Sequence, residues 1–311
     1  MIEARGLTKH YGDKLAVDGL SFDIRPGKVT GFLGPNGSGK STTMRMIVGL
    51  DGPDAGTVRV NGRRYRDLPW PLREVGSLLE AKAIHPGRSA RAHLWMLAQT
   101  NNIPKSRVGE VLDLVGLHDV AGRRAGKFSL GMGQRLGIAA ALLGDPEVLL
   151  FDEPVNGLDP DGIRWVRNLL RGLASEGRTV FVSSHLMSEM ALTADEVVVI
   201  GRGRLIAQMP VEELISADHR SYVRVRSPQL DPFKLALQRA GASVELEADG
   251  SLSVRGMGEA DIGDLALAEH VALHELAPQS ASLEEAFMEL TGESVEFRGG
   301  TTIATAGGGA P

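Results

Sequence analysis

Apolar and polar positions follow two different spacings along the first two thirds of the chain. Short runs that are almost continuously apolar alternate there with longer stretches of helical spacing. This alternation is typical of a mostly parallel sheet covered on both faces. The sequence therefore predicts an α/β domain over residues 1–210, with buried strands at 29–33, 148–151, 179–183 and 196–200 and helices at 40–49 and 161–174.

Between about residues 81 and 145 the strand pattern disappears. Apolar positions recur there at helical spacing in three segments, 90–99, 105–115 and 132–143. The pattern predicts a helical subdomain inserted into the α/β domain.

The pattern changes again after Pro210. An accessory module is expected over residues 211–297, and its order β-α-β-β-α-β indicates a small ferredoxin-like α+β fold. The last predicted element of the module is an amphipathic helix at 283–290, capped by Ser282. Residues 298–311 are rich in Gly, Thr and Ala and predict a disordered tail. The expected strands of the module are 222–226, 243–246, 252–255 and 271–276, and its helices are 232–240 and 261–268.

Composition narrows the class of protein. The 311 residues are 42% hydrophobic and 23% charged, as in a globular protein. No apolar stretch reaches the roughly 20 residues of a spanning helix, and the N-terminus lacks a secretory pattern. The absence of cysteine excludes disulfides and thiolate metal sites. A net charge of -5 argues against a broad nucleic-acid-binding surface. An anionic ligand would therefore have to be bound by a local device.

One such device is a glycine-rich loop between the first buried strand and the next helix. It matches G-x-x-x-x-G-K-S/T, in which backbone N–H groups and the helix N-terminus face phosphates. Lys40 is expected to reach the β- and γ-phosphates, and Ser41 to bind Mg²⁺. A plain glycine-rich turn is the alternative, but the flanking strand and helix favour nucleotide binding. The predicted nucleotide-binding residues are Gly34, Pro35, Asn36, Gly37, Ser38, Gly39, Lys40, Ser41 and Thr42.

A hydrolytic apparatus follows downstream. The apolar run 148–151 ends in two carboxylates, Asp152 and Glu153. A buried strand delivers Asp152 to the sheet edge, where it can hold Mg²⁺. Glu153 is then expected to orient or deprotonate the attacking water.

With these motifs in this order, residues 1–210 resemble the ATPase of ABC transporters. In that family a signature segment binds the γ-phosphate of ATP held by the opposite subunit, and the resemblance assigns this to Ser129 and Gly131. It implies that Asp159 couples the two sites across the dimer and that His185 contacts the γ-phosphate. A structural histidine is the alternative reading of His185 taken alone.

The resemblance also implies a role for an aromatic residue. Tyr11 precedes the phosphate loop by 23 residues, as does the aromatic that stacks on adenine in the family; a core tyrosine is the alternative. Glu80 stands where the family has a Mg²⁺-binding glutamine. Since a carboxylate is also a good ligand for Mg²⁺, Glu80 is expected to join Ser41 and Asp152 at the metal.

Two departures from the family pattern point to one branch. Residues 128–132 read Phe-Ser-Leu-Gly-Met in place of Leu-Ser-Gly-Gly-Gln, and Glu80 replaces glutamine. Together with the stretch 282–291, they resemble ATPase subunits of actinobacterial exporters of the daunorubicin and tetronasin type.

The resemblance implies an ATP-hydrolysing subunit that energises a separately encoded membrane permease, with drugs or antibiotics as the exported class. ATP and Mg²⁺ are the expected cofactors. A permease and a second ATPase subunit, in a homodimer, are the expected partners at the cytoplasmic face of the membrane, and no nucleic acid is expected. The alternatives are an importer subunit and a soluble ABC-type ATPase acting on nucleic acid or the ribosome.

Overall fold

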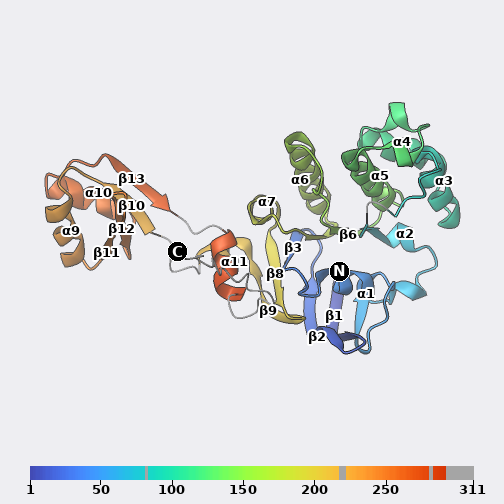
Figure 1. Ribbon diagram of the computed structural model, residues 1–311, viewed down its shortest axis with the longest axis horizontal. Helices are drawn as coiled ribbons and strands as arrows, with labels where there is room; N and C mark the ends of the chain where they lie inside the picture. The colour runs from blue at the N-terminus through green and yellow to red at the C-terminus, as the bar shows by residue number, and fades with distance from the viewer. Residues whose placement is uncertain (81–82, 217–221, 280–282, 292–311) are drawn as a thin grey trace, which may run out of the picture. The chain divides into compact units, whose positions relative to one another are not determined.

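The computed structural model describes residues 1–80, 83–216, 222–279 and 283–291 (Figure 1). It divides into two compact units, one built mainly on Met1–Gln208 and the other on Met209–Glu289.

The first unit is built on a six-stranded sheet. Its strand order is β5-β6-β7-β3-β8-β9, and the first five strands pair in parallel. Every residue of β3 and β7 is buried, as continuous apolar runs predict. The parallel α/β fold expected from the sequence is confirmed. The strands are β3 (Val29–Leu33), β5 (Val75–Leu78), β6 (Val148–Asp152), β7 (Thr179–Ser183), β8 (Glu196–Gly201) and β9 (Arg204–Pro210).

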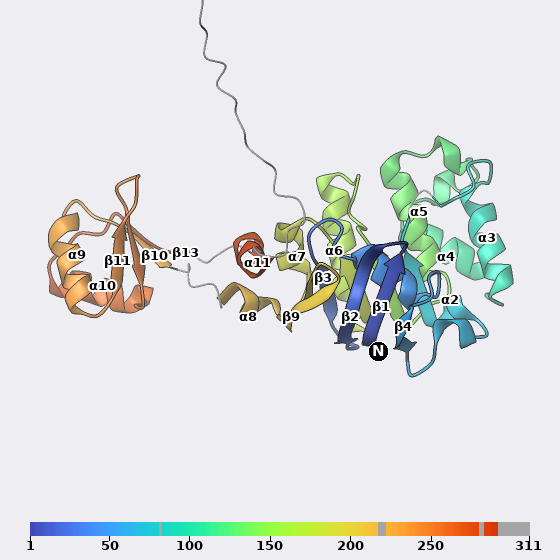
Figure 2. The ribbon, with the colours of Figure 1, turned by 60° about the horizontal axis from the view of Figure 1, so that its bottom comes forward.

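A second sheet of the first unit was not predicted from the sequence. The antiparallel strands β1 (Ile2–Tyr11), β2 (Lys14–Ile24) and β4 (Ala55–Val60) lie side by side in the order β2-β1-β4 (Figure 2). Helix α1 (Lys40–Ile47) and both sheets share one core, in which the rings of Phe32 and Phe181 lie 4.9 Å apart.

The helical insertion is present as expected. It contains α3 (Ala90–Thr100), α4 (Ser106–Leu114) and α5 (Leu130–Leu142), which gather in one group in Figure 1. Ser89 caps α3 and Ser129 caps α5. Helix α5 packs closely on β5, because a Cβ added at Gly76 would lie 1.9 Å from the carbonyl oxygen of Ala141.

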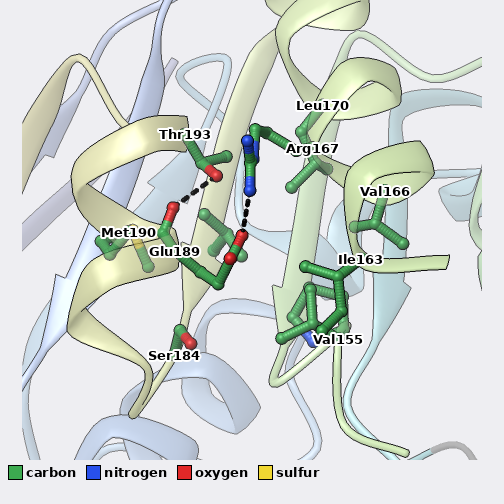
Figure 3. Close-up of a pocket in the computed structure, with 11 residues that line it drawn as sticks. Val155, Ile163, Val166, Arg167, Leu170, Ser184, Glu189, Met190 and Thr193 are labelled. Carbon is green, nitrogen blue, oxygen red and sulfur yellow. Dashed lines mark hydrogen bonds and ion pairs between the residues drawn. The ribbon is translucent and has the colours of Figure 1, made fainter. Parts of the chain in front are cut away.

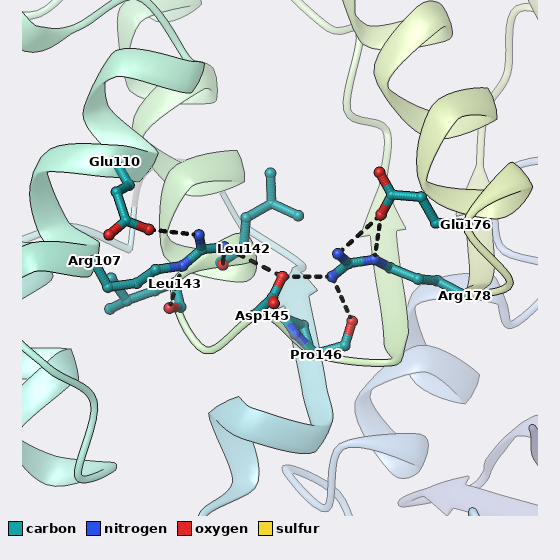
Figure 4. Close-up of polar contacts among 8 residues, drawn as sticks. All are labelled: Arg107, Glu110, Leu142, Leu143, Asp145, Pro146, Glu176 and Arg178. Carbon is teal, nitrogen blue, oxygen red and sulfur yellow. Dashed lines mark hydrogen bonds and ion pairs between the residues drawn. The ribbon is translucent and has the colours of Figure 1, made fainter.

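A polar network connects this helical group to the sheet (Figure 4). Arg107 of α4 donates from Nη2 to Asp145 Oδ1 at 3.3 Å, and Arg178, which precedes β7, donates from Nη1 to the same oxygen at 2.9 Å. Arg107 also donates to the carbonyl oxygens of Leu142 and Leu143 at the end of α5. Asp145 therefore links two cationic side chains from different parts of the unit.

Further helices complete the first unit. Helix α6 has a strongly amphipathic pattern that buries Val166, Leu170 and Leu173. The other elements are α2 (Pro71–Glu74), α6 (Pro160–Ser175), α7 (Met187–Thr193) and the 3₁₀ turns Tyr65–Asp67, His118–Val120 and Ala125–Lys127.

The second unit contains a four-stranded antiparallel sheet in the order β11-β12-β10-β13. With a helix after the first strand and another after the third, this is the ferredoxin-like arrangement expected from the sequence. Its own core includes Val225, Phe233, Val254 and Ile262. The elements are α8 (Val211–Ser216), β10 (Tyr222–Arg226), α9 (Leu230–Arg239), β11 (Ser243–Leu246), β12 (Leu252–Arg255), α10 (Glu259–Ala268) and β13 (Glu275–Gln279), followed by α11 (Leu283–Thr291).

The expected bounds of the last strand, 271–276, are wrong. Val271 and Leu273 pack against the core of the module from a loop, and the strand begins at Glu275. The backbone N–H of Ala272 donates to the Gln229 side chain. This backbone group of the irregular segment therefore has a hydrogen-bond partner without strand pairing. Ser282 and the tail 298–311 lie outside the described residues.

Candidate nucleotide site

The phosphate loop leaves β3 and opens α1, as the motif requires. Gly39 takes φ 103° at the start of the helix, and a Cβ there would lie 2.5 Å from the Ala16 carbonyl oxygen. A left-handed backbone with no room for a side chain explains glycine at this position. Ser38 is buried, and its hydroxyl has no hydrogen-bond partner in the described part of the chain.

Lys40 is held inside the loop. Its ammonium donates to the carbonyl oxygens of Gly34 at 2.6 Å and Pro35 at 3.2 Å, and the residue is 9% exposed. Burial lowers the pKa of Lys40, while Glu153 and Asp152 act in the opposite direction. A largely desolvated cation next to helix N–H groups is suited to attract phosphate.

The carboxylate of Asp152 lies at the carboxyl end of β6 and joins two serines. Ser41 of α1 donates to Oδ2 at 2.8 Å, and Ser183 at the end of β7 donates to Oδ1. Parallel strands bring these ends to one edge of the sheet, so residues far apart in sequence meet. Ser183 was not singled out by the sequence; its position as the last residue of the buried strand 179–183 was the available signal.

Glu153 sits at the centre of a second cluster. Its φ of 51° places the residue in the left-handed region, a strained conformation typical of functional sites. Oε2 lies 2.7 Å from His185 Nδ1 and accepts from the His185 backbone N–H at 3.3 Å. The sequence missed Gln134 of α5, a buried side chain that donates to the Glu153 carbonyl oxygen at 3.1 Å.

Tyr11 presents a half-exposed ring at the end of β1. Its hydroxyl donates to Asp51 Oδ2 at 2.6 Å, and Arg45 Nε donates to the same oxygen at 2.8 Å. The hydrogen bond to Asp51 raises the pKa of Tyr11, whereas Arg45 and Tyr11 lower the pKa of Asp51. Asp51 is a further residue that the sequence did not indicate.

A cleft of about 470 Å³ collects most of the predicted residues. Its volume lies in the usual range of small-molecule sites, and it presents an aromatic ring, backbone N–H groups, lysine side chains and two carboxylates. Its lining comprises Tyr11, Lys14, Ala16, Asn36, Gly37, Ser38, Gly39, Lys40, Ser41, Thr42, Leu79, Asp152 and Glu153.

Glu80 lies in an adjoining groove. Ser41 and Asp152 line this groove as well, together with Glu80 and the apolar side chains of Leu50, Leu78 and Ile84. Among the described residues, no three His, Cys, Asp or Glu side chains cluster in a way that could hold a metal ion.

Three of the predicted residues, Ser129, Gly131 and Asp159, do not line the cleft. Ser129 lines a separate hollow with Phe128 and Leu130, and its hydroxyl accepts from the Met132 N–H at the start of α5. Gly131 follows in the first turn of this helix. The Asp159 side chain accepts from the Gly162 N–H at 2.9 Å and so caps α6.

A glycine-rich loop between a buried strand and a helix, facing a strand that ends in Asp-Glu, defines a P-loop ATPase. Residues 17–156 match the ABC transporter family, and residues 221–284 match a domain of unknown function, DUF8746.

Curated relatives agree over nearly the whole chain. The bacitracin transport ATP-binding protein BcrA of Bacillus licheniformis is 37% identical, covering 94% of this chain and 97% of BcrA. The daunorubicin/doxorubicin resistance ATP-binding protein DrrA of Streptomyces peucetius is 33% identical, covering 96% of this chain and 94% of DrrA.

Solved structures match about two thirds of the chain. The dimeric structure of the bacterial ABC transporter cassette MJ0796 is 25% identical with a TM-score of 0.63, covering 68% of this chain and 98% of that one. The chain belongs to the ABC transporter ATP-binding proteins and is an ABC-type ATPase whose domain binds ATP. None of its described helices is both long and apolar enough to cross a membrane.

Proposed function

We propose that this ATPase drives a separately encoded membrane permease for drug or antibiotic export, bound peripherally at the cytoplasmic face. The observation that carries the proposal is the Glu153 carboxylate, which lines the nucleotide cleft and contacts His185 at 2.7 Å. The export class is supported by two relatives, the bacitracin transport protein BcrA and the daunorubicin/doxorubicin resistance protein DrrA.

The residues predicted from the sequence have distinct tasks in this proposal. Tyr11 stacks on adenine, the loop 34–42 wraps the phosphates, and Lys40 balances the charge of the β- and γ-phosphates. Glu153 accepts a proton from the attacking water or orients it, and His185 holds that carboxylate and contacts the γ-phosphate. ATP hydrolysis then breaks the bond between the β- and γ-phosphates and releases ADP and phosphate.

Mg²⁺ is the proposed metal. Ser41 and Asp152 already hold their oxygens 2.8 Å apart, and Glu80 lines the same groove, so a hydroxyl and two carboxylates offer the oxygen ligands that Mg²⁺ prefers. When bound, the ion neutralises charge that develops on the phosphates.

Two copies are proposed to complete each site. Ser129 and Gly131 start a helix outside the cleft of their own chain, so their helix N-terminus is free to meet the γ-phosphate held by a second copy. Asp159 lies at the link between the sites. We assign the ATPase domain to residues 1–210, its helical subdomain to about 81–145, and the accessory module to 211–297.

Mg²⁺-dependent ATP hydrolysis by the purified chain, with and without its permease, tests the proposal. Permease-stimulated turnover that Glu153→Gln abolishes, with ATP binding retained, is the expected result. Normal hydrolysis in Glu153→Gln would remove Glu153 from its role. Turnover indifferent to any permease would favour a soluble ATPase, and a requirement for an external binding protein would favour import.

A further inference from the structure

Helices α6 and α7 each begin directly after a segment that the proposed function places at the nucleotide site. The stretch 156–159 enters α6, which begins at Pro160, and His185 is followed by α7, which begins at Met187. Figure 3 shows a pocket between these helices, with Arg167 of α6 and Glu189 of α7 pointing toward one another.

Arg167 and Glu189 form a partly buried ion pair. Arg167 Nη2 donates to Glu189 Oε2 at 2.6 Å, and the two side chains are 23% and 24% exposed. Their surroundings are largely apolar, with Val155, Val166 and Leu170 among the lining residues. Limited access of water strengthens such a pair relative to one on the open surface.

The guanidinium of Arg167 depends on this contact. Its Nε is buried and makes no hydrogen bond in the part of the chain that the structure describes. Removing the Glu189 carboxylate would therefore leave a charged group in an apolar pocket without its acceptor, which is unfavourable. The pair is consequently a constraint on the spacing of α6 and α7.

His185 lies two residues before the first residue of α7, Met187. This helix has seven residues, and its N-cap, Leu186, provides no side-chain cap, so neighbouring groups must hold it in place. Glu189 lies in the first turn of α7, four residues after His185, which precedes the helix. A second link, from Arg171 Nη1 to the Leu192 carbonyl oxygen at 3.0 Å, holds the opposite end of α7 and is exposed.

We propose that Arg167 is a positioning residue for ATP hydrolysis: through Glu189 it holds α7 so that His185 stays in contact with Glu153. A displacement of the segment 156–159 at the start of α6 is thereby transmitted to the hydrolytic carboxylate. This inference rests on the proposed roles of Glu153 and His185.

Steady-state ATP hydrolysis by Arg167→Met, Glu189→Gln and the exchanged pair Arg167→Glu/Glu189→Arg tests it. Both single variants are expected to lower kcat about tenfold, since a small displacement of a reacting group has an effect of this order or larger, while the KM for ATP stays within about twofold. The exchanged pair should recover most of the lost kcat, and Arg167→Lys should retain more than Arg167→Met.

Arg164→Ala is the matched control. Arg164 lies on the same helix and pairs with Asp161, but the side chains are 69% and 81% exposed. Its kcat is expected to equal that of the unaltered chain, because such surface pairs contribute little. Thermal unfolding of every variant shows whether a loss of kcat accompanies a loss of fold.

Two outcomes would overturn the proposal while leaving the ATPase intact. One is a normal kcat in Arg167→Met. The other is a folded exchanged pair that stays as slow as the single variants, which would show that the pairing itself does not set the rate. Failure of the proposed function is distinguishable, because Glu153→Gln would then hydrolyse ATP normally in an otherwise unaltered chain.

Discussion

Asp51 belongs to none of the sequence motifs, yet it supports the predicted site residue Tyr11. It accepts hydrogen bonds from the Tyr11 hydroxyl and from Arg45, and so restrains a ring that is otherwise 47% exposed. In the proposed site, where Tyr11 stacks on adenine, this restraint reduces the ordering cost of stacking. The spacing of Tyr11 from the phosphate loop was visible in the sequence, whereas its partner required the three-dimensional path of the chain after α1.

Asp51→Ala should raise the KM for ATP about three- to tenfold, a part of the roughly 1–3 kcal/mol that base stacking contributes. The kcat should change less than about twofold, because Asp51 does not line the cleft beside the carboxylates. Steady-state kinetics checks both values, with the exposed Asp67→Ala as control. An unchanged KM would show that Tyr11 needs no such support.

His93 of α3 predicts a pH effect on stability. Burial, with a smaller contribution from Arg88, lowers its pKa, so the folded chain keeps His93 neutral at pH values where the unfolded chain protonates it. The unfolded state therefore binds more protons, and stability falls as the pH drops below about 6.5. His93→Gln should show a shallower decline between pH 7 and pH 5, by at most about 1.4 kcal/mol per pH unit, measured by urea unfolding. Identical slopes would contradict this.

At the scale of elements, buried strands were the most predictable part of the fold. The run 179–183 and the observed strand β7 coincide, because a strand buried on both faces needs an uninterrupted apolar sequence. Strands β1 and β2 escaped prediction, since they mix buried and exposed positions with register shifts that blur the alternation. The alternation of Ile2 and Ala4 was the signal that could have revealed the start of β1.

Asp145 lies between α5 and β6. Substitutions of Asp145 can separate the effect of its charge from the effect of its backbone conformation. Its φ is 55°, a left-handed backbone that Asp and Asn tolerate better than Ala. Asp145→Asn removes the ion pairs with Arg107 and Arg178 and should lower the free energy of unfolding by about 0.5–1 kcal/mol, since Asp145 is largely exposed. Asp145→Ala should cost about 1 kcal/mol more through backbone strain. Urea unfolding of both variants checks the order, and equal losses would show that the strain is absent.

For the whole molecule, the central fact is that each unit has a core of its own. The ATPase unit and the second unit bury separate sets of side chains. The ferredoxin-like order of elements was visible in the sequence because its strands and helices are short and regularly spaced. The late start of β13 was not visible, because apolar residues in a packed loop and in a strand give the same local pattern.

Phe233→Ala tests the independence of the two cores. Phe233 is fully buried in the second unit, so its truncation should destabilise that unit by about 3–5 kcal/mol. Differential scanning calorimetry should show the transition of the second unit shifted or lost, while the other transition keeps its ATP-dependent rise in Tm. A single transition, shifted by both the substitution and ATP, would show that the units unfold together.

The sequence by itself determined the ATPase class and the parallel α/β fold, and it predicted the order of domains and the residues of the phosphate loop. These depend on short-range requirements, such as glycine where a loop turns around phosphates and apolar residues before Asp152 and Glu153. Only the tertiary structure decided which residues support them. Ser183 reaches Asp152, Gln134 reaches Glu153, and Arg167 reaches Glu189 through contacts between elements distant in the chain. Such contacts depend on the packing of whole helices and strands, and no local spacing encodes them.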